Sequence, residues 1–109
     1  MSQALAKLQC EPCQGGVPAL TPEQIKPLLA QLSGWEVVND HHLSKTYAFK
    51  NFVQGLLFTN KIGEIAEQQQ HHPDIHLAYD AVTITIWTHK IDGLTHSDFV
   101  LAAKCDAVV

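Results

Sequence analysis

The strongest constraint on the fold is the alternation of side chains between Val82 and His89. Branched apolar residues stand at every second position in most of this stretch, with threonine or tryptophan between them. A period of two is typical of a β-strand that buries one face. The segment Ile75–Tyr79 precedes it with only two residues between, so the two segments together predict a β-hairpin.

A second hairpin is predicted earlier in the chain. The segments Trp35–Asn39 and Leu43–Phe49 contain the β-branched and aromatic residues that strands favour. The polar run Asn39-Asp40-His41 supplies the turn between them. We therefore expect four strands in all.

Two shorter helices are predicted at the two ends of this strand pattern. The first begins at Thr21, which can form a capping box with Gln24, and ends near Gly34. Pro27 removes an interior hydrogen bond, so this helix is expected to be short or kinked. The last helix begins at Thr95, a good N-cap residue.

A long helix is predicted between the two hairpins, roughly from Phe52 to Gln70. Its apolar residues recur at steps of three and four, as on one face of a helix. Pro73 disfavours helical angles at His72, so the helix should stop near His71.

The predicted order is therefore α-β-β-α-β-β-α. This order predicts a single α+β domain with a four-stranded antiparallel sheet and helices packed on one face. A chain of 109 residues suits one domain. Residues 1–19 show weak periodicity and are expected to form an N-terminal tail or irregular lead-in, with the domain spanning 20–109.

Charge and hydropathy exclude several classes of function. The formal net charge is -4, and the seven Lys and Arg are scattered without a basic stripe, so no nucleic-acid partner is expected. No apolar stretch is long enough to span a bilayer, so no membrane partner is expected either. The first residues lack the apolar core of a secretory signal, which predicts a cytoplasmic protein.

The three cysteines do not indicate a disulfide framework, because their number is low and odd. Cys10 and Cys13 form one CxxC, which could supply half of a zinc site, but no second half is present. The simpler interpretation is a reduced pair on a mobile N-terminal tail.

Histidines are the residues that most suggest chemistry. Histidine exchanges protons near neutral pH, and five of the seven fall late in the chain, at positions 71, 72, 76, 89 and 96. Glu67 lies four residues before His71 on the predicted helix, so it can orient that imidazole and favour its charged form. If the helix packs on the sheet, His72 and His89 could face one cleft.

Plainer roles are open for most of these side chains. A histidine pair at a helix end can simply act as a C-terminal cap. His41, His42, His76 and His96 are expected at turns or on solvent-facing positions, and no role is assigned to them. Asp98 is interpreted as a helix-capping carboxylate and is kept outside the catalytic set.

A metal site is the rival chemical interpretation. Ligand-type side chains are present at His71, His72, Asp74, His76 and His89. However, the sequence has no HExxH motif and no paired CxxC spacing. No metal site and no cofactor are therefore predicted.

These residues also form a longer pattern with defined spacing. It reads Glu67-x3-His71-His72-Pro73-x5-Tyr79-x9-His89-x8-Asp98. This pattern resembles the signature of the pterin-4a-carbinolamine dehydratase family, and the similarity covers roughly residues 20–106. Two departures stand out: Gln70 replaces a residue that is often acidic, and no aromatic residue closely follows Pro73.

The resemblance implies an activity and a setting. The expected reaction is dehydration of 4a-hydroxytetrahydropterin to quinonoid dihydropterin, which recycles the cofactor of aromatic amino-acid hydroxylases such as phenylalanine hydroxylase. It also implies a homodimer or homotetramer, with sheets joined at their edges or long helices packed together. Two alternatives remain open: a non-catalytic dimerisation-cofactor module, and a pterin enzyme linked to molybdopterin metabolism.

The resemblance further implies the site residues. Three histidines line the pterin pocket in the family, and they correspond here to His71, His72 and His89. We expect His72 and His89 to form an acid/base pair and His71 to orient the pterin. The expected substrate-binding residues are Glu67, Pro73 and Thr88.

Overall fold

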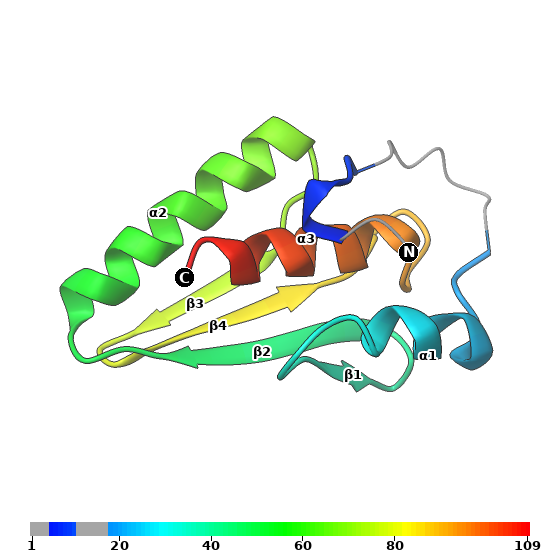
Figure 1. Ribbon diagram of the computed structural model, residues 1–109, viewed down its shortest axis with the longest axis horizontal. Coiled ribbons are helices and arrows are strands. Elements are labelled where there is room, and N and C mark those ends of the chain that lie inside the picture. The colour runs from blue at the N-terminus through cyan, green and yellow to red at the C-terminus, as the bar shows by residue number, and fades with distance from the viewer. Residues whose placement is uncertain (1–4, 11–17) are drawn as a thin grey trace.

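Four strands form one antiparallel sheet, with helices packed over one of its faces (Figure 1). The computed structural model describes residues 5–10 and 18–109. Its elements are η1 (Leu5–Lys7), α1 (Pro22–Leu29), β1 (Glu36–Val38), β2 (His42–Ala48), α2 (Phe52–Gln69), β3 (Asp74–Ala78), β4 (Ala81–Ile86) and α3 (His96–Ala107). The strand order is β1-β2-β4-β3, and the predicted α+β class and order of elements are confirmed.

The register of the sheet places apolar side chains on the face covered by α2 and α3. Leu43 pairs with Ile86, and Tyr47 pairs with Val82; all four are buried. The opposite face is polar and more open, as expected for an antiparallel sheet with one packed face. The alternation in β4 therefore points its branched residues at the helices.

Strand β4 is shorter than the sequence suggests, because it ends at Ile86 rather than at His89. Beyond it, Thr88 and Gly93 form an isolated bridge, in which Thr88 N donates to Gly93 O at 2.9 Å. Asp92 N also donates to Thr88 O at 2.9 Å, which closes a tight turn. We call residues 88–93 the 88–93 turn; it carries His89.

The first helix shows which local signals hold in the structure. Thr21 N donates to Gln24 Oε1 at 2.9 Å, and Gln24 N donates to Thr21 Oγ1 at 3.3 Å, so the capping box is present. The helix ends at Leu29, so the predicted end near Gly34 is wrong. Gly34, which has a positive φ of 81°, lies instead in the turn that leads to β1. The expectation of a short helix is met, with Pro27 inside it.

A polar cluster lies at the edge of the core, near the C-terminal end of α3. The Asp106 carboxylate accepts hydrogen bonds from Trp35 Nε1 at 3.0 Å, from Lys45 Nζ at 2.8 Å and from the Tyr47 hydroxyl. Burial and the adjacent Asp106 carboxylate raise the pKa of the Tyr47 phenol above its ordinary value. This cluster ties β2 and the start of β1 to the last helix.

Where the structure describes it, the segment before α1 packs against the rest of the domain. Leu5 is buried in the core, and Lys104 Nζ donates to Ala6 O at 2.8 Å. Cys10 N donates to Gln69 Oε1 at 2.9 Å, and burial raises the pKa of the Cys10 thiol to about 11. Cys10 therefore belongs to the packed domain, whereas Cys13 lies outside the described residues. No helix in the described residues is long and apolar enough to cross a membrane.

We expect Gly93→Ala to lower the free energy of unfolding by about 1–3 kcal/mol. A Cβ at Gly93 would lie 2.7 Å from the Ala19 Cβ, closer than packed carbon atoms approach. Gly63→Ala in α2 is the matched control, because nothing lies within 4 Å of its added Cβ. That control should raise stability by about 0.5–1 kcal/mol. Urea unfolding of both variants checks the pair, and equal effects would contradict the packing at Gly93.

Candidate active site

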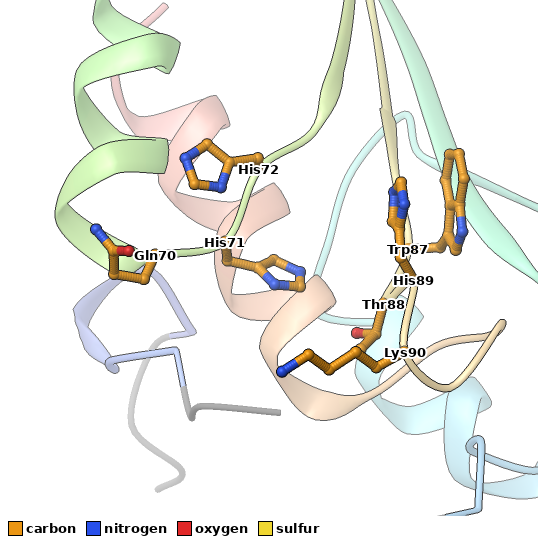
Figure 2. A pocket seen from close by; sticks show the side chains of 7 residues that line it. All are labelled: Gln70, His71, His72, Trp87, Thr88, His89 and Lys90. Carbon is orange, nitrogen blue, oxygen red and sulfur yellow. The ribbon is translucent and has the colours of Figure 1, made fainter. Parts of the chain in front are cut away.

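A cavity of about 350 Å³ opens between the end of α2 and the 88–93 turn (Figure 2). Its lining comes from two segments far apart in the sequence. The lining residues are Gln70, His71, His72, Trp87, Thr88, His89 and Lys90. The fold therefore brings the three predicted histidines to one cavity, which matches the expectation of a shared cleft.

The end of α2 sets the positions of the first two histidines. Gln70 has a left-handed conformation with φ 53° and ψ 40°. The amide groups of Gln70 and His71 both donate to Ala66 O, which ends the helix as a compact cap. The chain then continues through Pro73 into β3, so that His71 and His72 are held at a sharp change of direction.

His71 bonds to a residue that the sequence analysis kept outside the catalytic set. Its Nε2–H donates to Asp98 Oδ1 at 2.5 Å, and the Asp98 side chain is fully buried. The other carboxylate oxygen, Oδ2, accepts from Thr88 Oγ1 at 2.8 Å and from Thr95 N at 2.8 Å. Asp98 thus caps α3, as predicted, and also orients His71.

Glu67 pairs with His72, which corrects the predicted Glu67–His71 pair. His72 Nε2 lies 2.5 Å from Glu67 Oε2. The left-handed Gln70 takes His71 off the helical path, so the spacing of four residues no longer brings it beside Glu67. Both partners are largely exposed, with 56% of the His72 side chain and 75% of the Glu67 side chain accessible. A pair this exposed contributes little to the free energy of unfolding, so its main effect is to orient the His72 ring.

The third histidine lies across the cavity on the 88–93 turn. The His89 imidazole stacks on the Trp87 indole, with ring centroids 4.2 Å apart and planes 5° from parallel. Thr88 is buried and its hydroxyl donates to Asp98, so its side chain supports the turn. Glu67 and Pro73, the other expected substrate-binding residues, are not among the residues that line the cavity.

Trp87, Lys90 and the second role of Asp98 were not predicted from the sequence. The position of Asp98 at the end of the spaced pattern was the signal that could have indicated its role. The positions of Trp87 and Lys90 beside the Thr88-His89 pair could have drawn attention to them. In the described part of the chain, no group of three or more His, Cys, Asp or Glu is arranged to hold a metal ion.

This arrangement is suited to proton transfer on a small ligand. Imidazoles stand on two sides of one cavity, and histidine both donates and accepts protons near neutral pH. Each of His71 and His72 has a carboxylate partner that fixes one ring nitrogen as the donor. The cavity size suits a ligand of one fused ring system.

Comparison with known proteins decides the family. The family model described as "Pterin 4 alpha carbinolamine dehydratase" matches residues 18–108. The chain belongs to this family. The expectation of a hydro-lyase is confirmed, because this match and the names of the relatives all denote a dehydratase of pterin-4-alpha-carbinolamine.

Two curated relatives illustrate the similarity. A protein of Rubrobacter xylanophilus is 55% identical over 102 residues, covering 94% of this chain and 95% of its own. A protein of Alkaliphilus metalliredigens is 52% identical over 103 residues, covering 94% and 93%. Both are named pterin-4-alpha-carbinolamine dehydratase as a provisional assignment.

Two solved structures share the fold. A transcriptional coactivator/pterin dehydratase from Brucella melitensis superposes with a TM-score of 0.78 at 31% identity, covering 83% of this chain and 97% of its own. A pterin dehydratase-like protein identified as a RuBisCO assembly factor in the alpha-carboxysome has a TM-score of 0.61 at 23% identity. It covers 70% of this chain and 89% of its own, and shows the likeness of fold alone.

We expect Asp98→Ala to lower the free energy of unfolding by about 1–3 kcal/mol, because it leaves three buried or half-buried hydrogen-bond donors without this acceptor. The donors are the groups of His71, Thr88 and Thr95 that now bond to the carboxylate. Asp74→Ala is the control, because Asp74 is exposed at the start of β3. It should change stability by no more than about 0.5 kcal/mol. Urea unfolding measures both, and a small effect at Asp98 would contradict its central position.

Proposed function

We propose that this enzyme dehydrates 4a-hydroxytetrahydropterin to quinonoid dihydropterin by histidine acid/base catalysis. The observation that carries the proposal is the opposition of His72 and His89 across one cavity (Figure 2). Both rings are exposed to the cavity and to solvent, so each can take up and release protons. His71 has its Nε2 committed to Asp98, which suits it to a fixed hydrogen bond with the pterin.

The reaction needs one proton delivered and one removed. The lone pair of N5 forms a double bond to C4a as the C4a–O bond breaks. An acid protonates the departing hydroxyl to water, and a base removes the proton from N5. The sum is loss of one water, with no net change in the protonation of the protein. Two histidines on opposite walls provide both functions.

We assign two kinds of role to these residues, proton transfer and substrate orientation. His72 and His89 are the acid/base pair, and Glu67 orients His72 through the observed contact. His71 holds and orients the substrate, with Asp98 fixing its imidazole. Thr88 acts through its hydrogen bond to Asp98, and Pro73 fixes the path of the chain after the histidine pair.

We expect His72→Ala and His89→Ala each to lower kcat by about 10²–10⁴-fold, because each removes one proton-transfer group. The measurement is the decay of enzymatically generated 4a-hydroxytetrahydropterin, followed by ultraviolet absorbance with chelator-treated protein. His76→Ala is the matched control, since His76 lies exposed on β3 away from the cavity lining, and it should keep wild-type activity.

Two outcomes would contradict this assignment. If folded wild-type protein did not accelerate the decay, the catalytic proposal would fail. If His71→Ala lost more turnover than His72→Ala while substrate binding stayed intact, the division of roles would be wrong.

The biological setting that we propose is recycling of the pterin cofactor of aromatic amino-acid hydroxylases, such as phenylalanine hydroxylase, in the cytoplasm. Hydroxylation with a tetrahydropterin leaves the 4a-hydroxy product, so the proposed reaction returns that product to the cycle. The match to the dehydratase family supports this setting.

We also propose that the protein is a homodimer or homotetramer. The first half of α2 exposes four large apolar side chains, and Tyr79 is exposed in the turn after β3; the α2 residues are Phe52, Val53, Leu56 and Leu57. Contiguous exposed apolar residues commonly mark an interface. Strand β3 is also an edge of the sheet, so it can pair with a strand of a second subunit.

The same apolar surface favours a second candidate function, in protein binding. The Brucella structure carries the description of a transcriptional coactivator as well as a pterin dehydratase. If the apolar surface of α2 binds another protein, that binding should persist when the histidines of the cavity are replaced. A pull-down with the His72→Ala variant separates this function from catalysis.

We expect Leu57→Glu to shift the protein to a smaller assembly, because it places a charge in the apolar surface of α2. Sedimentation velocity at several protein concentrations measures the change. Gln68→Glu is the control, since it adds the same charge at an exposed polar position near the other end of the helix. An unchanged sedimentation coefficient for Leu57→Glu would place the interface elsewhere.

A further inference from the structure

Trp87 is the residue against which the third histidine of the cavity rests. Figure 2 shows the His89 imidazole between the Trp87 indole and the side chains of His71 and His72. The two stacked rings are nearly parallel, at 5°, with centroids 4.2 Å apart. One face of the His89 ring therefore lies on the indole while the ring borders the cavity.

The three histidines differ in what holds them. His71 and His72 each bond to a carboxylate, from Asp98 and Glu67 respectively. For the His89 imidazole, the contact that the structure shows among the described residues is the stack on Trp87. An exposed imidazole on a turn has several accessible rotamers, so a flat partner is needed to select one of them.

Trp87 itself packs beside the β1–β2 hairpin, against His41 in the turn and His42 at the start of β2. The indole lies 5.5 Å from the His41 ring and 6.0 Å from the His42 ring, centroid to centroid. His41 Nε2 lies 2.7 Å from Asp92 Oδ1, which belongs to the same turn as His89. The β1–β2 hairpin thus contacts both the indole and the turn that carries His89.

We propose that Trp87 is a positioning residue for the dehydration: it holds the His89 imidazole by stacking, at the orientation needed for proton transfer. This inference rests on the proposed function. The role of Trp87 follows from its stack on the His89 ring, and His41 contacts the indole from the β1–β2 hairpin. A direct contact between Trp87 and the substrate is the competing arrangement, because Trp87 also lines the cavity.

The two arrangements predict that replacing Trp87 changes different kinetic constants. A stack of this kind contributes about 0.5–1.5 kcal/mol, so its loss should lower kcat about two- to tenfold. We expect Trp87→Leu to show this fall with KM nearly unchanged. Trp87→Phe keeps an aromatic face and should restore most of kcat. A Trp87 that contacts substrate would instead give a raised KM.

A double-mutant cycle with His89→Ala tests whether Trp87 acts through His89. If it does, the Trp87→Leu/His89→Ala double variant is no slower than His89→Ala alone. Urea unfolding of each variant shows that the compared proteins are folded. Additive losses of kcat in the double variant, or a rise in KM for Trp87→Leu, would overturn the proposal.

A spectroscopic measurement tests the geometry independently of activity. In a ¹H–¹³C spectrum, stacking over the indole moves the His89 ring protons upfield, and Trp87→Leu should abolish that shift while the His76 ring protons stay in place. The absence of an upfield shift in the wild type would overturn the proposal. If the shift is present but wild-type protein does not dehydrate the pterin, the stack stands and the proposed function fails.

Discussion

The Asp98 carboxylate is fully buried and accepts hydrogen bonds from three parts of the fold. His71 follows the end of α2, Thr88 opens the 88–93 turn, and Thr95 precedes α3. A buried carboxylate without such donors is costly, so all three segments must be in place together. The cavity lies between two of these segments, and its shape therefore depends on this one charge. The carboxylate that caps α3 thus also ties the His71 side of the cavity to the 88–93 turn.

The three imidazoles of the cavity are held by three kinds of interaction. His71 has a buried carboxylate, His72 an exposed one, and His89 an indole face. A hydrogen bond to a carboxylate is stronger where water is excluded, so we expect the His71 ring to be the most firmly held of the three. The two more exposed rings retain access to solvent, from which protons are exchanged. This gradient from rigid to accessible matches the division between orienting and proton-transferring groups that we propose.

Helix α2 joins two surfaces of different character. Its first half exposes large apolar side chains, while its end delivers the histidine pair to the cavity. A helix of 18 residues is about 27 Å long, so the two surfaces are well separated. Association through the first half can therefore occur without covering the cavity, which allows catalysis and protein binding to coexist in one chain.

The sequence alone determined the class of fold and indicated four of the residues that line the cavity, namely His71, His72, Thr88 and His89. Side-chain periodicity, the Thr21 capping box and Pro73 are local signals, and local signals set the type and approximate ends of the elements. Local signals do not determine which side chains contact one another across the fold. The expected Glu67–His71 pair followed a helical spacing that the left-handed Gln70 breaks, and β4 ended early because Thr88 and Gly93 pair within a turn.

Tertiary structure decided how the site is held together. The bond between His71 and Asp98 joins residues 27 apart in the chain, and the contact between His41 and Asp92 joins residues 51 apart. Such pairs have no fixed spacing in the sequence, because they depend on how whole elements pack. The burial of Leu5 beside α3 has the same origin. The sequence thus pointed to the histidines to which we assign the chemistry, and packing decided which group orients which.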